Sequence, residues 1–248
     1  DNMRAYAGTD IGCVRTMNQD GYFCSTTPIG PFPNLFIVAD GMGGHKAGDY
    51  ASRYTVETLE KLIRESTLSE PAAIIESAVK QANTMLLEEA NNHEEMKGMG
   101  TTLVICTIHD NVLTVANVGD SRLYVVNQEI RQITKDHSLV EEMVRMGEMD
   151  KETARNHRDK NIITRAIGAV PEVDVDFFEI NLDPEDEILM CTDGLTNMVP
   201  DAELALLLQE SAFFDAPGVL VDRALKGGGQ DNITVLLLGV ETTEETNG

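Results

Sequence analysis

The chain has 248 residues, of which 42% are hydrophobic, and this is enough apolar content for a substantial core. Its 19 basic and 42 acidic residues give a formal net charge of −23, and a surface of that charge repels nucleic acid and anionic lipid. The longest apolar runs are far too short to span a bilayer, so neither a nucleic-acid partner nor a membrane partner is expected.

Short apolar runs, each bounded by Gly, Asp or Asn, predict β-strands along the chain. They cover 35–39, 102–108, 112–118, 122–126, 187–191 and 233–238. Only the turn-like sequence NVGDSR separates the third run from the fourth. This spacing predicts hairpin-like antiparallel pairing within residues 111–127.

Five segments have the apolar spacing of helices. They cover 47–62, 71–86, 138–146, 201–209 and 216–226. The second carries Pro71 in its first turn, where proline is well tolerated. The third opens with a capping box, in which Glu141 follows Ser138 by three residues.

Strands and helices occur in blocks rather than in strict alternation, which favours an α+β fold with mostly antiparallel sheets over a doubly wound parallel sheet. Nothing interrupts the chain strongly enough to mark a boundary, so one domain over 1–240 is predicted. The polar tail 241–248 is predicted to be disordered. Residues 148–161 have almost no apolar content and predict an exposed flap with a short helical turn.

The four cysteines show no CxxC spacing, and two of them, Cys106 and Cys191, lie inside apolar runs. Cysteine in such runs usually behaves as a small hydrophobic residue. Reduced thiols and a cytoplasmic location are therefore expected.

The stretch from Phe36 to Gly48 reads FIVADGMGGHKAG, so an apolar run ends on Asp40 and four of the next eight residues are glycine. A tight turn, a phosphate-binding loop and a metal site are the three candidate explanations. A hairpin turn predicts an alternating strand next, but the following residues have helical spacing. The phosphate-loop patterns GxxxxGK[ST] and GxGxxG are both missing from the stretch.

Further aspartates share the setting of Asp40 at the edge of an apolar strand, which favours the metal site. They are Asp120, Asp193 and Asp231, and Asp20 precedes an apolar pair. A buried carboxylate needs a cation, and few basic residues lie close in sequence to these positions. Aspartates without a Cys/His cluster favour the hard cations Mg²⁺ and Mn²⁺. Gly41 would then let a backbone carbonyl approach the ion.

Six sequence blocks occur in a fixed order: RTMNQD (15–20), ADGMGGHKAG (39–48), GMGTT (98–102), NVGDSR (117–122), CTDGL (191–195) and GGQDNITV (228–235). Together they resemble the metal-dependent serine/threonine protein phosphatases of type 2C, in their compact bacterial branch. The resemblance runs from about residue 5 to 240. It implies a four-layer αββα sandwich, with two antiparallel β-sheets flanked by helices.

The resemblance also implies the roles of the core site residues. Asp40 would bridge two metal ions, and the backbone carbonyl of Gly41 would bind the second. Asp193 and Asp231 would complete the coordination of the first ion. Asp20 would hold a metal-bound water.

Two further roles follow from the same resemblance. Asp120, together with Asp193, would bind a third and weaker ion. Arg15 would grip the substrate phosphate, a task suited to a planar bidentate donor.

The implied activity is hydrolysis of phosphoserine and phosphothreonine monoesters, by in-line attack of a metal-bridging hydroxide without a phosphoenzyme. The expected cofactors are Mn²⁺ or Mg²⁺, as two core ions and a third weaker ion. The expected partners are phosphoproteins and a cognate serine/threonine kinase, and the chain is expected to be a monomer.

The sequence departs from the family pattern at two places. Eukaryotic members carry a histidine, often assigned as general acid, where this chain has Met42, so the general acid is unassigned. Many members have Glu where this chain has Gln19. His45 is expected to pack within its loop. The remaining histidines are predicted to be surface or cap residues: His93, His109, His137 and His157.

Two other classes of protein stay open at this point. The first is a catalytically weak phosphatase-like module with a regulatory or binding role, which the intact Asp40, Asp193 and Asp231 argue against. The second is another metal hydrolase, such as a nuclease or a nucleotide phosphatase. The net charge disfavours a nuclease, and a panel of substrates would decide the nucleotide case.

Overall fold

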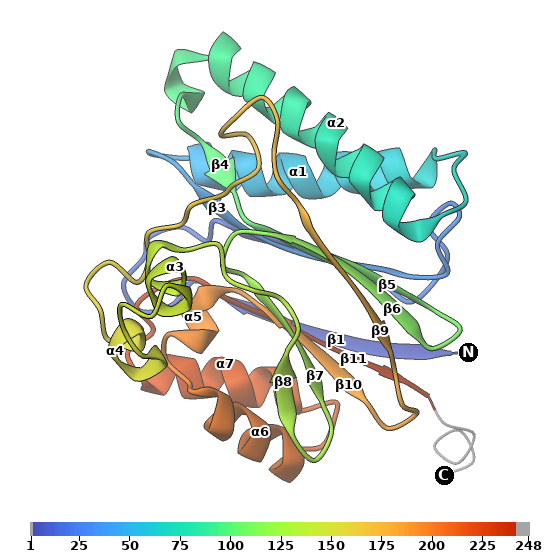
Figure 1. Ribbon diagram of the computed structural model, residues 1–248, viewed down its shortest axis with the longest axis vertical. Coiled ribbons are helices and arrows are strands. Elements are labelled where there is room, and N and C mark those ends of the chain that lie inside the picture. Colours follow the sequence, from blue (N-terminus) through green and yellow to red (C-terminus); the bar gives the residue numbers. More distant parts are fainter. Residues whose placement is uncertain (1, 242–248) are drawn as a thin grey trace.

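The computed structural model describes residues 2–241, which form two antiparallel β-sheets packed between layers of helices (Figure 1). The first sheet has the order β1-β11-β10-β7-β8. Its strands are β1 (Met3–Asp10), β11 (Ile233–Val240), β10 (Glu187–Cys191), β7 (Arg122–Val126) and β8 (Ile130–Gln132). The second sheet has the order β2-β3-β5-β6-β9, and β4 pairs with β3. Its strands are β2 (Asp20–Ser25), β3 (Leu35–Met42), β4 (Gly100–Thr101), β5 (Leu103–His109), β6 (Val112–Val118) and β9 (Asp176–Asn181).

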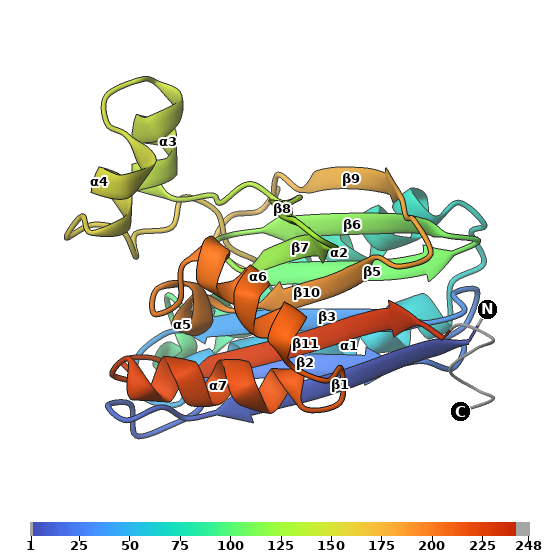
Figure 2. The ribbon, with the colours of Figure 1, turned by 90° about the horizontal axis from the view of Figure 1, so that it is seen from below.

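Helices cover the outer face of each sheet, so the expected αββα sandwich is confirmed. The second sheet is covered by α1 (Ala47–Arg64) and α2 (Pro71–Asn92), which a short turn, η1 (Glu94–Met96), follows. The first sheet is covered by α5 (Asp193–Thr196), α6 (Asp201–Glu210) and α7 (Ala216–Lys226). Two short helices, α3 (Leu139–Arg145) and α4 (Lys151–Arg155), project from the body (Figure 2). The predicted flap, residues 148–161, contains α4, which is the short helical turn expected there.

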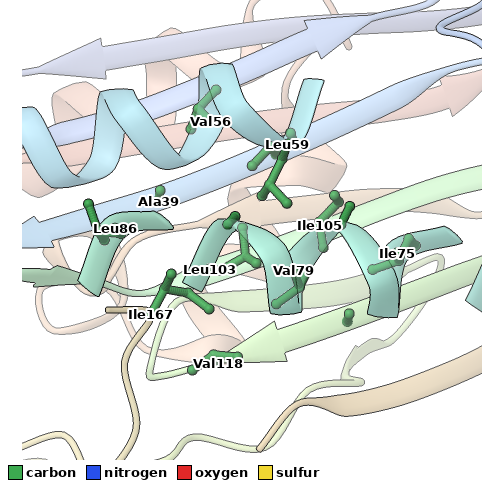
Figure 3. Close-up of a cluster of buried hydrophobic side chains, with 14 of the residues drawn as sticks. Ala39, Val56, Leu59, Ile75, Val79, Leu86, Leu103, Ile105, Val118 and Ile167 are labelled. Atoms are coloured by element: carbon green, nitrogen blue, oxygen red, sulfur yellow. The ribbon is translucent and has the colours of Figure 1, made fainter. Parts of the chain in front are cut away.

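Three hydrophobic clusters fill the three interfaces between the layers. Along β3, Leu35 and Ile37 face α1 and α2, whereas Phe36 and Val38 face the first sheet. Figure 3 shows the outer cluster, in which Leu59 of α1 lies above the second sheet. Fully burying such a side chain stabilises the fold by about 1.5–3 kcal/mol. Burial on both faces explains why the central strands are continuous apolar runs.

The predicted hairpin over 111–127 is wrong. β6 pairs with β5 and β9 in the second sheet, whereas β7 pairs with β10 and β8 in the first. The hairpin that does form joins β5 to β6 through Asp110 and Asn111, whose φ angles of 50° and 63° suit a tight turn. Since β6 belongs to the second sheet and β7 to the first, residues 119–121 carry the chain from one sheet to the other. Asp120 therefore lies between the sheets.

One end of the sandwich carries α3, α4 and α5, and the start of β1 and the end of β11 lie at the opposite end (Figures 1 and 2). The predicted tail 241–248 lies outside the described residues except for Glu241, whose N–H donates to the carbonyl of Asn2 (2.7 Å). All four cysteine thiols are free, as expected. Among residues 2–241, no helix combines the length and apolar composition that crossing a bilayer requires.

Candidate metal centre

Strands of both sheets bring the predicted aspartates to the end of the sandwich that carries α5. Asp20 opens β2 and lies directly opposite Asp40 on β3. Asp193 follows β10 and Asp231 precedes β11, so the first sheet supplies two carboxylates to the same end. Asp120 lies between β6 and β7. The antiparallel pairing explains why positions so distant in the sequence converge.

Three of these carboxylates are close enough to share a cation. Asp40, Asp193 and Asp231 each offer one oxygen, and the three oxygens lie within 4.8 Å of one another. Carboxylate oxygens at this spacing are the donor set that Mg²⁺ and Mn²⁺ prefer. The sequence analysis named all three residues.

Asp20 links the two sheets beside this cluster. Its Oδ2 accepts hydrogen bonds from the hydroxyls of Thr192 (3.0 Å) and Thr234 (2.7 Å), which belong to the β10 and β11 side of the sandwich. Its Oδ1 is buried without a hydrogen-bond partner, and so is Oδ1 of Asp193. Two carboxylate oxygens without protein donors in one cluster are compatible with a site for a cation.

The protein alone disfavours the charged form of these carboxylates. Burial raises the pKa of Asp20 to about 7, and the nearby charges of Asp193 and Asp231 add to the rise. Burial also raises the pKa of Asp40, and the charges of Asp20 and Asp193 act in the same direction. Burial raises the pKa of Asp120 as well, and the charge of Asp193 adds to the rise. A divalent cation reverses this balance, because it stabilises the ionised carboxylates.

The backbone around Asp40 is fixed by a residue to which sequence reasoning assigned no role. The hydroxyl of Thr102 accepts from the N–H of Asp40 (2.9 Å), and the N–H of Thr102 donates to the carbonyl of Asp40 (2.9 Å). The same hydroxyl is 2.7 Å from Oγ of Ser121, the neighbour of Asp120. Thr102 therefore connects the two acidic positions. It lies within the block GMGTT, and that block was the feature of the sequence that could have pointed to it.

Gly41 and Gly194 allow two segments to approach the site closely. A Cβ on Gly41 would lie 1.8 Å from the carbonyl oxygen of Gly48, and one on Gly194 would lie 1.9 Å from that of Asn232. The structure thus gives Gly41 a packing role at the start of α1. This role differs from the reason inferred from the sequence, which was access for an ion.

Arg15 lies at the rim of the carboxylate cluster. Its Nε is 3.4 Å from Oδ1 of Asp231, and its side chain is 57% exposed. The loop that carries it is held by Asn232, whose side chain donates to the carbonyls of Ile11 and Met17 (both 2.9 Å) and accepts from the N–H of Gln19 (2.9 Å). An exposed guanidinium beside a buried acidic site is well placed for an anionic ligand.

Two predictions about histidines are wrong. His137 was expected on the surface or at a cap, but it is buried. Its Nδ1 accepts from the N–H of Gly119 (3.0 Å), and its Nε2 is 2.8 Å from Asp176. The polar sequence around it concealed that it lies where the projecting segment with α3 and α4 leaves the body of the molecule. His45 was expected to pack in its loop, but it is exposed, with a φ of 54°.

The model of the protein phosphatase 2C family matches residues 13–220. This chain belongs to the protein phosphatase 2C family. The serine/threonine phosphatase stp of Listeria monocytogenes is 40% identical over 98% of each chain. The solved structure of the serine/threonine phosphatase Stp1 from Staphylococcus aureus has a TM-score of 0.90 and 36% identity, and the match covers 97% of this chain and 96% of that one.

A further solved structure contains metal ions. It is the catalytic domain of the serine/threonine protein phosphatase PstP in complex with two manganese ions, with a TM-score of 0.85 and 31% identity. The match covers 97% of this chain and 99% of that chain. The 2C family is metal-dependent, and the acidic cluster described above agrees with that property.

Proposed function

We propose that this chain hydrolyses phosphoserine and phosphothreonine monoesters of phosphoproteins with the help of divalent cations. The observation that carries the proposal is the cluster of Asp40, Asp193 and Asp231, built from both sheets in a chain of the 2C family. An inactive regulatory module of the same fold has no need to keep three converging carboxylates that lack buried basic partners. That arrangement is costly without a cation.

The acidic residues fit a pair of hard cations. Asp40 would be shared by the two ions, Asp193 and Asp231 would hold the first, and the carbonyl of Gly41 would hold the second. Asp20 would contribute through a water. The close oxygens of the cluster and the orphaned Oδ1 atoms of Asp20 and Asp193 support these assignments.

Asp120 takes a separate role in the proposal, as a ligand of a third and weaker ion shared with Asp193. Asp120 is buried, and Asp193 contributes to the rise of its pKa, which supports a shared position. Both residues also line one cleft. A site with few carboxylates binds Mg²⁺ or Mn²⁺ loosely, because the hydrated ion gives up its waters reluctantly.

The residues of the chain prepare the site for a phosphate monoester. When bound, divalent ions lower the pKa of water and neutralise the charge of the phosphate. Arg15 binds the phosphate oxygens from the rim, because its guanidinium is exposed and adjacent to Asp231. The hydroxyls of Thr192 and Thr234 donate to Asp20 and favour its ionised form.

Several finer points belong to the same proposal. Mn²⁺ is the first metal to test, since manganese is bound in the PstP structure, and Mg²⁺ is the second. A cognate serine/threonine kinase would supply the phosphoproteins that the chain dephosphorylates. A monomer is proposed. The free cysteines support a reducing, cytoplasmic location.

The test compares Mn²⁺-dependent phosphate release from a phosphothreonine peptide with release from a nucleotide. We expect the peptide to be the better substrate. Asp193→Asn should lower turnover roughly 100-fold or more, because it removes a charge placed for the reaction. The matched control is Asp174→Asn, which changes an exposed aspartate in a loop. Preference for the nucleotide, or full activity of Asp193→Asn, would contradict the proposal.

A further inference from the structure

A cleft of about 500 Å³ lies between the projecting helices and the body of the molecule. Its walls come from α3, α4, α5 and β7, and both Asp120 and Asp193 line it, so it is continuous with the metal centre. The volume is within the range of about 300–1,000 Å³ that is usual for ligand sites. A peptide whose phosphorylated residue occupies the metal centre can therefore place a neighbouring segment here.

The charge of this cleft differs from that of the rest of the protein. Six cationic side chains line it, namely Arg122, Lys135, Arg145, Lys151, Arg155 and Lys160. Five acidic side chains also line it, two of which are the candidate metal ligands Asp120 and Asp193. The cleft thus carries a slight excess of cations in a chain whose net charge is −23. Ions bound at the metal centre make it more positive still.

Five of these cations make no ion pair within residues 2–241. Arg155 instead donates to backbone carbonyls, and the other four are Lys135, Arg145, Lys151 and Lys160. Elsewhere cations pair locally on the helix surfaces, as Arg53 does with Asp49 and Lys80 with Glu76. The charges of Arg145 and Lys151 both act on the pKa of Glu141, which lines the same cleft, but neither cation forms an ion pair with that carboxylate. In a chain with 42 acidic residues, four cations gathered without ion pairs in one cleft are free to bind an anionic partner, and their charge is complementary to one.

The cationic wall is fixed relative to the metal centre. Arg155 of α4 donates to the carbonyls of Thr196 (2.8 Å) and Asn197 (3.4 Å) at the end of α5, whose first residue is Asp193. The side chain of Asn197 also donates to that of Asn161 (3.0 Å). These bonds hold α4 and the residues after it, with their cationic side chains, beside the candidate metal centre.

We infer that this cleft selects phosphoprotein segments with acidic residues next to the phosphorylated serine or threonine. The inference rests on the proposed phosphatase activity and adds a substrate preference to it. Lys135, Arg145, Lys151 and Lys160 bind the acidic side chains, and the metal centre binds the phosphate. Long-range repulsion from the rest of the chain acts on every acidic peptide, so selection depends on these local contacts.

The test uses two phosphothreonine peptides, one with two glutamates before the phosphothreonine and one with two glutamates after it. Each is compared with the same peptide in which glutamines replace the glutamates. We expect the ratio of kcat/KM between one of the glutamate peptides and its glutamine counterpart to be roughly ten, because its glutamates form two or three exposed ion pairs with the cleft. The variant Arg145→Gln/Lys151→Gln/Lys160→Gln should bring this ratio close to one, and the ratio cancels any general loss of turnover. The matched control, Lys61→Gln/Lys97→Gln/Lys226→Gln, removes three charges elsewhere and should keep the preference.

The outcomes separate this inference from the proposed activity. If wild-type protein hydrolyses acidic and glutamine peptides equally well, or if the cleft variant keeps the preference, the inference is wrong and the phosphatase activity stands. If none of the phosphopeptides is hydrolysed in the presence of Mn²⁺, the proposed activity itself fails.

Discussion

At the scale of single residues, the site depends on groups that control charge at the end of the sandwich. Arg15 lies beside the carboxylate cluster, with its Nε 3.4 Å from Oδ1 of Asp231. It is exposed, so a phosphate can approach it without the removal of other protein groups. An exposed guanidinium contributes mainly to binding when its contact exists before the reaction and persists through it.

Arg15→Ala should therefore raise KM more than it lowers kcat on a phosphothreonine peptide. A hydrogen bond to a charged group contributes about 1.5–3 kcal/mol, so kcat/KM should fall about tenfold or more. Arg53→Ala is the matched control, because its side chain is 58% exposed and also pairs with an aspartate. Equal kcat/KM for Arg15→Ala and wild-type protein would remove Arg15 from phosphate binding.

Sequence reasoning identified the acidic residues but not the groups that orient them. Asp40, Asp193 and Asp231 were recognisable because each ends or precedes an apolar strand. Thr192 and Thr234 were not, because their role depends on the two sheets meeting at Asp20. A hydroxyl in a buried strand has no local signature that separates a functional contact from simple packing.

At the scale of elements, the strands buried on both faces were predictable and the edge strands were not. β3 and β11 are continuous apolar runs, so the sequence alone indicated them. β1 is partly exposed and pairs with β11 from the other end of the chain. The hairpin error at NVGDSR has the same origin, since pairing between distant strands decided which sheet each strand joined.

The segment with α3 and α4 begins at His137, whose contacts should make the stability of the protein depend on pH. Nδ1 of His137 accepts from the N–H of Gly119, so the neutral ring carries its proton on Nε2, facing Asp176. Burial lowers the pKa of His137. Asp176 and Asp136 oppose this shift, and Arg165 adds to it. Protonation at Nδ1 would set two N–H groups against each other.

The sign of the pH dependence follows from this lowered pKa. The unfolded chain takes up the proton near pH 6.5, and the folded protein takes it up only at lower pH. The contribution of His137 to stability is therefore complete above about pH 6.5 and is lost as the pH falls below that value. A single proton limits the slope to about 1.4 kcal/mol per pH unit.

His137→Gln should reduce the loss of stability between pH 7 and pH 5 relative to wild-type protein, and it should lower stability at pH 7. Denaturant unfolding at each pH measures both effects, and subtraction from wild type removes the contribution of every other group. His109→Gln is the control, since that side chain is exposed at the end of β5. If His137→Gln and wild-type protein have the same pH slope, His137 does not cause the dependence.

At the scale of the whole molecule, the metal centre joins the two sheets. The second sheet contributes Asp20 and Asp40, and the first contributes Asp193 and Asp231. Without cations, burial raises the pKa of both Asp20 and Asp40, and the charge of Asp193 adds to each rise. This unfavourable environment weakens the end of the sandwich where the sheets meet. A ligand that binds the folded protein but not the unfolded chain stabilises it in proportion to its occupancy.

Mn²⁺ should therefore raise the melting temperature of the protein. At a concentration of 100 Kd, one site contributes about 2.7 kcal/mol. For a chain of this size that corresponds to roughly 5–10 °C. Asp193→Asn should lose most of this increment, and its melting temperature without metal should equal or exceed that of wild-type protein, because repulsion with Asp231 is relieved. Thermal unfolding with and without Mn²⁺ measures both effects independently of activity.

Asp174→Asn, with the same change of charge in an exposed loop, should respond to Mn²⁺ as wild-type protein does. An equal response in Asp193→Asn would show that the stabilising ion binds elsewhere.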